Sequence, residues 1–116
     1  MSKSLLIIDD DEMVLDAVSS IFTELGYQVE SFSDPIKGLK RALENPFDLV
    51  LSDLRMPTLD GAALTKILKE HYPQQKILIL TAFPADPLAI QALEAGATGL
   101  MRKPFEIEKI LKLIEA

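Results

Sequence analysis

The stretch Leu5-Leu6-Ile7-Ile8-Asp9-Asp10-Asp11-Glu12 places four acidic residues directly after an apolar run. A short run of branched apolar side chains is typical of a strand that is buried on both faces of a sheet. The residues that follow repeat apolar positions at steps of three and four up to Gly26, which is typical of the end of an amphipathic helix. These apolar positions are Val14, Leu15, Val18, Ile21, Phe22 and Leu25. A buried strand followed by such a helix predicts the first unit of a parallel sheet.

The same alternation of strand and helix continues to the end of the chain. Further strands are predicted over 27–32, 48–52, 76–81 and 98–102, and further helices over 35–44, 61–71, 87–95 and about 107–114. Asp34-Pro35 and Asp86-Pro87 each combine a helix-capping acid with a proline suited to the first helical turn. The last helix has its apolar stripe at Ile107, Ile110, Leu111 and Ile114. We predict one domain, residues 1–116, of the α/β class, in which five helices cover a five-stranded parallel sheet.

Composition excludes several classes of protein. The 116 residues contain no Cys, which rules out disulfides and thiolate metal sites. The longest uninterrupted apolar runs, Leu5 to Ile8 and Ile77 to Leu80, are far too short to span a membrane. No secretory signal precedes the first strand, so the expected compartment is the cytoplasm. A net charge of −6 argues against direct nucleic-acid binding, which depends on Lys and Arg.

Chemically active side chains follow four of the predicted strands. Asp9 and Asp10 follow the first strand, Asp53 the third, Thr81 ends the fourth, and Lys103 follows the fifth. In an open parallel sheet, ligands bind beyond the carboxyl ends of the strands, so these side chains are expected to meet. Three carboxylates repel one another, and a hard cation such as Mg²⁺ would keep them ionised. A carboxylate can also accept a phosphoryl group, whose oxygens Lys and Thr can bind. The pattern predicts phosphoryl transfer to a carboxylate.

With these motifs, the chain resembles a response regulator receiver domain over essentially its whole length. The matching segments are 5–12, Asp53-Leu54-Arg55-Met56-Pro57 with Asp60-Gly61, Leu80-Thr81-Ala82, and Ala95-Gly96-Ala97 through Lys103-Pro104-Phe105. The resemblance implies a flavodoxin-like, doubly wound sheet with strand order 2-1-3-4-5. It also implies a cis peptide bond between Lys103 and Pro104 as a frequent family feature.

The resemblance further implies a role for each site residue. Asp53 is expected to be the phosphoacceptor and Asp10 a direct Mg²⁺ ligand, with Asp9 holding the metal through water. The backbone carbonyl of Arg55 is expected to complete the protein's share of the coordination. Thr81 and Lys103 would bind the phosphoryl group once it is in place.

The function implied is that of a regulatory switch and not of an enzyme that turns over a substrate. A sensor histidine kinase, a histidine phosphotransfer protein or a small phosphodonor would phosphorylate Asp53. The new charge would alter protein binding, including possible homodimerisation, on the surface of the fourth helix, fifth strand and fifth helix. This surface could expose an apolar patch at Leu88, Ile90, Leu93, Leu100 and Leu113, although most of these side chains are expected in the core.

Two positions depart from the common family pattern. Leu100 replaces the aromatic residue that many receivers carry three positions before the lysine, so an aromatic rotamer switch cannot be the readout. Phe83, two positions after Thr81, replaces a residue that is often polar or acidic. Together with Arg55, Phe83 is expected to flank the path of a water that attacks the phosphoryl group and so to alter its lifetime.

Other readings stay open at this point. The fold could serve as a docking or dimerisation module that needs no phosphorylation, or as a true Mg²⁺-dependent hydrolase that uses Asp53. A flavin-binding protein would share the fold, but the acidic strand ends would repel a flavin phosphate. Asp11 and Glu12 are interpreted as acids at a helix N-terminus. The single histidine, His71, is interpreted as a residue at a helix end and not as a phosphodonor.

Overall fold

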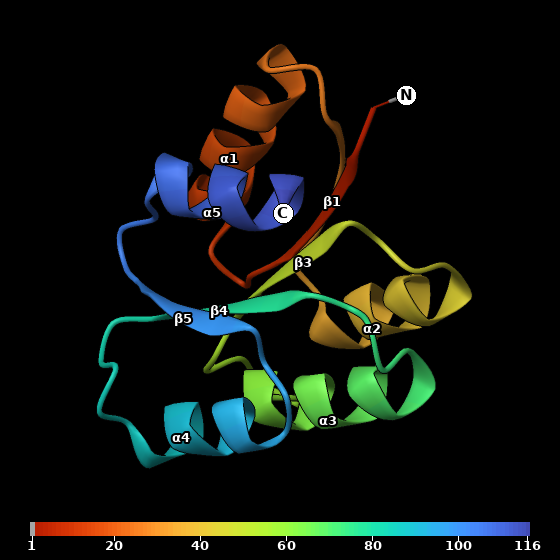
Figure 1. Ribbon diagram of the computed structural model, residues 1–116. Helices are drawn as coiled ribbons and strands as arrows, with labels where there is room; N and C mark the ends of the chain where they lie inside the picture. The colour runs from red at the N-terminus through yellow and green to blue at the C-terminus, as the bar shows by residue number, and fades with distance from the viewer. Residues whose placement is uncertain (1) are drawn as a thin grey trace.

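The computed structural model describes residues 2–116 as an open sheet with helices on both faces (Figure 1). Its elements, in chain order, are β1 (Ser4–Ile8), α1 (Glu12–Glu24), β2 (Gln28–Phe32), α2 (Pro35–Glu44), β3 (Leu49–Asp53), α3 (Gly61–His71), β4 (Ile77–Thr81), α4 (Pro87–Glu94), β5 (Gly99–Arg102) and α5 (Ile107–Glu115). All five strands are parallel, in the order β2-β1-β3-β4-β5. The α/β class, the helix and strand count and the strand order 2-1-3-4-5 are therefore confirmed.

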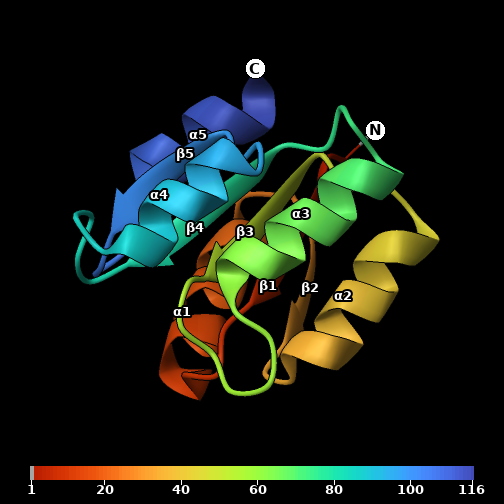
Figure 2. The ribbon, with the colours of Figure 1, turned by 90° about the horizontal axis from the view of Figure 1, so that it is seen from below.

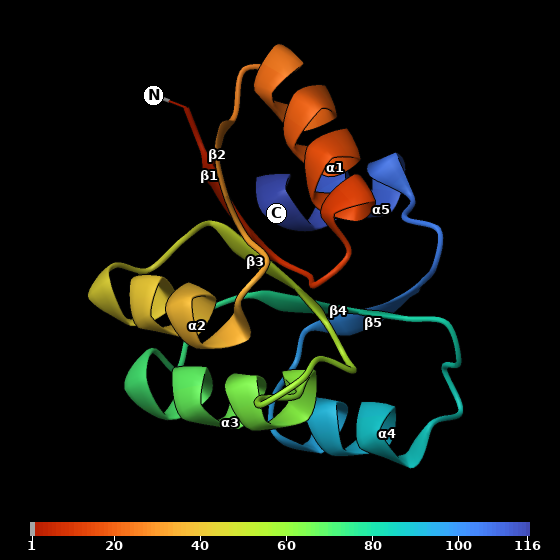
Figure 3. The ribbon, with the colours of Figure 1, turned by 180° about the vertical axis from the view of Figure 1, so that it is seen from behind.

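The helices divide into two layers. Helices α2, α3 and α4 lie side by side on one face of the sheet (Figure 2), and α1 and α5 cover the other (Figure 3). Alternate residues of each central strand enter the two layers, so that Leu6 and Ile8 pack with one core cluster and Leu5 and Ile7 with the other. Strands β1, β3 and β4 are consequently buried on both faces, as their unbroken apolar runs predict.

The helix starts follow the predicted capping residues. Asp34 accepts hydrogen bonds from the backbone N–H groups of Ile36 and Lys37, and Asp86 accepts one from that of Leu88. Asp11 caps α1 in the same way, which confirms its place at a helix N-terminus. Gly61 starts α3 directly beneath the end of β3, where a Cβ atom would lie 2.7 Å from the carbonyl oxygen of Asp53. Only glycine permits this close approach of helix and strand.

The strand boundaries differ from the predicted ones by one residue. β1 begins one position earlier, β2, β3, β4 and β5 each begin one position later, and β3 also ends one position later. Before β3, Asp48 bonds to the neighbouring strand with its side chain: its carboxylate accepts a hydrogen bond from the backbone N–H of Ser4. At β5, the hydroxyl of Thr98 accepts one from the backbone N–H of Ile77. Leu25 was predicted on the buried stripe of α1, but it is the C-cap residue and is 52% exposed. The helix ends here, and the next residue, Gly26, has a φ of +94°.

Within residues 2–116, no helix is both long enough and apolar enough to cross a membrane.

Candidate functional site

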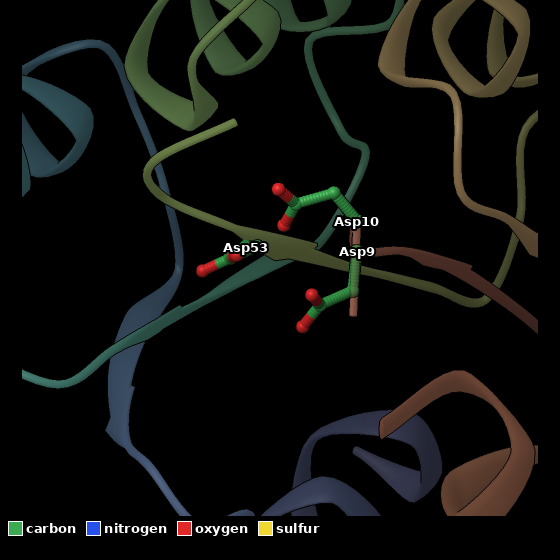
Figure 4. A group of neighbouring side chains, drawn as sticks. All are labelled: Asp9, Asp10 and Asp53. Atoms are coloured by element: carbon green, nitrogen blue, oxygen red, sulfur yellow. The ribbon is translucent and has the colours of Figure 1, made fainter. Parts of the chain in front are cut away.

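Three carboxylates meet at the carboxyl end of the sheet (Figure 4). Asp9 and Asp10 directly follow β1, and Asp53 is the last residue of β3. Because β1 pairs with β3, with Ile8 opposite Ser52, the two strand ends lie next to each other. One carboxylate oxygen from each aspartate lies within 4.8 Å of the other two. The predicted cluster of Asp9, Asp10 and Asp53 is therefore present.

Burial makes the negative charge of this cluster costly. Asp9 is 1% exposed and Asp53 5% exposed, whereas Asp10 is exposed to solvent. Burial raises the pKa of Asp9 to about 6, with a further contribution from the charge of Asp53. Burial likewise raises the pKa of Asp53, against the opposing influence of Lys103. The cluster is an electrostatically strained part of the structure.

Lys103 supplies a positive charge to the cluster. Its Nζ atom lies 3.1 Å from Oδ1 of Asp53 and 3.9 Å from Oδ2 of Asp9. Partial burial opposes the charge of the ammonium, but the two aspartates outweigh it, so the pKa of Lys103 is raised. The Lys103–Pro104 peptide bond is cis, as the family resemblance implies. Lys103 thus reaches the acidic cluster from the loop between β5 and α5.

The cluster fits a divalent cation. Oδ1 of Asp9 accepts a hydrogen bond from the backbone N–H of Asp11 at 2.9 Å. Oδ2 of Asp9 is buried and has no hydrogen-bond partner among the residues that the structure describes. A buried carboxylate oxygen without a donor is costly, and a metal ion would supply the missing positive partner. The donors are all oxygen atoms, which suits Mg²⁺ better than a softer metal.

A pocket of about 280 Å³ opens beside Asp53. Its lining residues are Asp53, Leu54, Arg55, Thr81, Ala82, Phe83, Asp86 and Lys103. Asp53 accepts a hydrogen bond from the backbone N–H of Leu54 at 2.9 Å. The Thr81 hydroxyl donates to the carbonyl of Phe83 and accepts from its N–H, at 3.2 and 3.1 Å. Thr81 therefore lies beside the predicted phosphoacceptor, with its hydroxyl bonded within its own loop.

An ion pair at this pocket escaped the sequence analysis. Nε of Arg55 donates a hydrogen bond to Oδ2 of Asp86, and Nη2 donates one to Oδ1, both at 2.8 Å. The guanidinium holds the pKa of Asp86 below its ordinary value. From sequence, Arg55 was considered for its backbone carbonyl and for flanking the path of water, and Asp86 for capping a helix. The two residues are 31 positions apart, and no spacing rule connects them.

The other residues singled out from sequence fall outside the acidic cluster. His71 ends α3 and packs edge-on against Tyr72, at the end of the sheet away from the aspartates. Phe83 lines the pocket and is 73% exposed. Of the predicted apolar patch, Ile90 and Leu93 on α4 are exposed, whereas Leu88, Leu100 and Leu113 are partly buried against the core.

Comparisons with known proteins agree with this geometry. The model of the response regulator receiver domain family matches residues 5–115. The chain is 36% identical over 110 residues to the transcriptional regulatory protein FixJ of Bradyrhizobium diazoefficiens, covering 95% of this chain and 54% of FixJ. It is 36% identical over 109 residues to the DNA-binding transcriptional regulator NtrC of Proteus hauseri, covering 94% of this chain and 23% of NtrC. The chain therefore spans between about a quarter and about half of the length of these two relatives.

The fold matches solved structures equally well. The Vibrio cholerae chemotaxis protein CheY4 superposes with a TM-score of 0.87 at 30% identity, with 99% of this chain and 98% of CheY4 covered. A sheet of order 2-1-3-4-5, an acidic cluster at its carboxyl end and a family match over nearly all residues lead to one conclusion. This chain belongs to the family of response regulator receiver domains.

Proposed function

We propose that residues 1–116 form a single phosphorylation-controlled signalling domain in which Asp53 accepts a phosphoryl group. The observation that carries this proposal is the position of Asp53, which is buried beside two further aspartates and lies 3.1 Å from the Lys103 ammonium. A carboxylate in this setting can act as a nucleophile, and a lysine beside it can hold the oxygens of the incoming group. The donor is the phosphohistidine of a sensor histidine kinase or of a histidine phosphotransfer protein, or a small phosphodonor.

The chemical step forms a bond between an Asp53 carboxylate oxygen and phosphorus. The phosphorus–nitrogen bond of the donor breaks, and its electron pair leaves with the histidine ring. Lys103 is already beside Asp53 and balances the charge that the phosphoryl group brings. Thr81 leaves its hydrogen bonds with Phe83 and turns its hydroxyl to the new oxygens.

The proposed cofactor is Mg²⁺, held by Asp9, Asp10 and Asp53 and by the backbone carbonyl of Arg55. When bound, Mg²⁺ would neutralise charge on the transferring phosphoryl group. Asp10 is the exposed member of the cluster and so offers the metal direct access from solvent. Asp9 keeps Oδ1 on the Asp11 N–H, and its Oδ2, which has no hydrogen-bond partner among the described residues, lies 3.9 Å from the Lys103 ammonium.

The output of the switch is a change in protein binding and not the turnover of a substrate. Phosphorylation would bias the surface formed by α4, β5 and α5, where Ile90 and Leu93 are exposed. This surface is proposed to bind a partner protein or a second copy of the chain.

Intact mass spectrometry after incubation with Mg²⁺ and acetyl phosphate tests the proposal. The expected result is a gain of one phosphoryl group that requires Mg²⁺ and is lost in Asp53→Asn. Asp48→Asn, at the other end of β3, is the matched control and should still gain it. A gain that survives in Asp53→Asn would contradict the assignment of the acceptor. A folded protein that binds no Mg²⁺ and gains no mass would favour the docking or dimerisation module, and rapid, saturable hydrolysis of a phosphate ester would favour the hydrolase.

A further inference from the structure

The ion pair between Arg55 and Asp86 bridges two loops at the mouth of the phosphoacceptor pocket. Arg55 lies two residues after Asp53, in the loop between β3 and α3, and Asp86 lies at the start of α4. Both hydrogen bonds measure 2.8 Å, so the guanidinium binds the carboxylate with two of its nitrogen atoms. The Arg55 side chain is 68% exposed, whereas that of Asp86 is 11% exposed. The arginine is therefore the solvent-exposed partner of the pair, and the aspartate is the one held against the start of α4.

Asp86 performs two tasks with one oxygen. Its Oδ1 accepts a hydrogen bond from the Leu88 N–H at 2.9 Å, which caps α4, and another from Nη2 of Arg55 at 2.8 Å. The ion pair therefore joins the loop that follows Asp53 to the first turn of α4. A group that drew Arg55 away would leave the cap in place and release this connection.

Phosphorylation of Asp53 would create a competitor for Arg55. The phosphoryl group carries between one and two negative charges near neutral pH, and a guanidinium binds two of its oxygens in the same way as it binds a carboxylate. Among the residues that the structure describes, two cationic side chains line the pocket, Lys103 and Arg55. Lys103 already faces Asp53 and Asp9, so Arg55 is the cation still available to the new charge.

We infer that Arg55 is a second cationic ligand of the phosphoryl group. While Asp53 is unmodified, Arg55 is paired with Asp86 instead. When Arg55 leaves Asp86 and binds the phosphoryl group, it shields that group from water. The first turn of α4 then loses its connection to the loop after β3. This role deepens the proposed function and rests on it, because it requires Asp53 to be phosphorylated.

Phosphoryl lifetime in four proteins tests the exchange: the wild type, Asp86→Asn, Arg55→Gln and the double variant. Asn is as good a helix cap as Asp, so Asp86→Asn removes the charge and keeps the hydrogen bond from Leu88. With Arg55 released, the lifetime should lengthen about threefold, which corresponds to the strength of a partly exposed ion pair. Arg55→Gln should shorten the lifetime, and in its presence Asp86→Asn should have no effect. Asp86→Asn acting equally with and without Arg55, or shortening the lifetime, would overturn the inference.

A double-mutant cycle on thermal unfolding gives a readout that does not depend on phosphoryl chemistry. Coupling between Arg55 and Asp86 should be measurable in the unmodified protein and absent after addition of Mg²⁺ and beryllofluoride, a phosphoryl mimic. The matched control is the pair Arg41 and Glu30, which also forms two hydrogen bonds, of 2.7 and 2.9 Å, far from the pocket. Its coupling should not change. If the Arg55–Asp86 coupling persists with the mimic bound, this inference is wrong and the proposed function still stands. If the wild type takes up no phosphoryl group, both the proposed function and this inference are wrong.

Discussion

The two ends of the β-sheet bury polar side chains under opposite conditions. At the amino end, Gln75 is 3% exposed, and its amide satisfies the backbone N–H and C=O of Phe47 at 2.9 and 2.8 Å. At the carboxyl end, Asp9 is buried to the same degree, yet one of its carboxylate oxygens has no hydrogen-bond donor. The amide of Gln75 finds its hydrogen-bond partners within the chain. Oδ2 of Asp9, in contrast, has no hydrogen-bond donor among the residues that the structure describes.

This contrast separates structural from functional burial. A buried amide with its partners in place stabilises the fold, and its removal leaves those partners without hydrogen bonds. A buried carboxylate without them costs folding free energy, which is consistent with a site made for a cation and a phosphoryl group. The two ends are therefore expected to respond to mutation with opposite signs.

The largest stability change is expected at the amino end. Gln75→Leu keeps the approximate volume of the side chain and leaves the N–H and C=O of Phe47 without partners. We expect it to lower the free energy of unfolding by about 3 kcal/mol, measured by urea denaturation. Uptake of the phosphoryl group by the folded variant should be unchanged. A stability equal to that of the wild type would show that water replaces the amide, and the contrast between the ends would fail.

The second prediction concerns pH and the carboxyl end. In the unfolded chain Asp9 titrates near 3.8, and in the folded protein burial raises its pKa to about 6. Between these values the folded state holds the proton more tightly, so stability is expected to fall as the pH rises through this range. Without metal, the loss from about pH 4 to pH 7 should be on the order of 2 kcal/mol. Urea denaturation at several pH values measures it, with Asp9→Asn as the protein in which this slope should be reduced.

Glu30 and Asp86 provide an internal check on this slope. Their arginine partners lower the pKa of each carboxylate, so their contribution to stability is lost as the pH falls through the ordinary pKa values of 4.5 for Glu30 and 3.8 for Asp86. Their effect on stability therefore has the opposite sign to that of Asp9 and is confined to the acidic end of the range in which Asp9 titrates. Addition of Mg²⁺ should reverse the trend, because the cation binds the ionised Asp9 and stabilises the protein more at pH 7 than at pH 5.

A smaller change in stability, and one of opposite sign, is expected from Asp9→Asn at pH 7. The variant keeps the oxygen that accepts from the Asp11 N–H and removes a buried negative charge beside Asp53. We expect the free energy of unfolding to rise by about 1 kcal/mol without metal, and Mg²⁺ binding to weaken at least about tenfold. Thermal unfolding and calorimetric titration with Mg²⁺ measure the two effects. A destabilised variant that binds Mg²⁺ normally would contradict the assignment of Asp9 to the metal site.

The sequence predicted the fold well because local and global signals agree. Apolar runs such as Leu5 to Ile8 are buried on both sheet faces, and Asp34 and Asp86 cap the helices that their Pro neighbours indicate. The strand order followed from the family resemblance and not from periodicity. The exposure of Leu25 was missed because the apolar period continues to the residue at which the helix already ends.

The site was predictable only in part. Topology brings Asp9, Asp10 and Asp53 together, since each directly follows or ends one of two neighbouring strands. The pairing of Arg55 with Asp86 was not predictable, because it depends on the shape of two loops between elements. Rules of periodicity and capping describe elements, and they contain no information on which loop side chains meet.

The smallest effect is expected at Phe83, the apolar wall of the pocket. Its ring is 73% exposed and lies beside the path by which water would reach the phosphoryl group. In Phe83→Glu, a carboxylate at this position would orient that water, so the phosphoryl lifetime should shorten, by less than the about hundredfold that a fixed general base supplies. Loss of bound phosphoryl group over time, followed by intact mass, measures it. Phe83→Gln has the same shape without the charge and should differ less from the wild type, so the comparison isolates the carboxylate. A lifetime that Phe83→Glu leaves unchanged would mean that this exposed ring does not control access of water, and that the buried cluster and Arg55 alone set the rate.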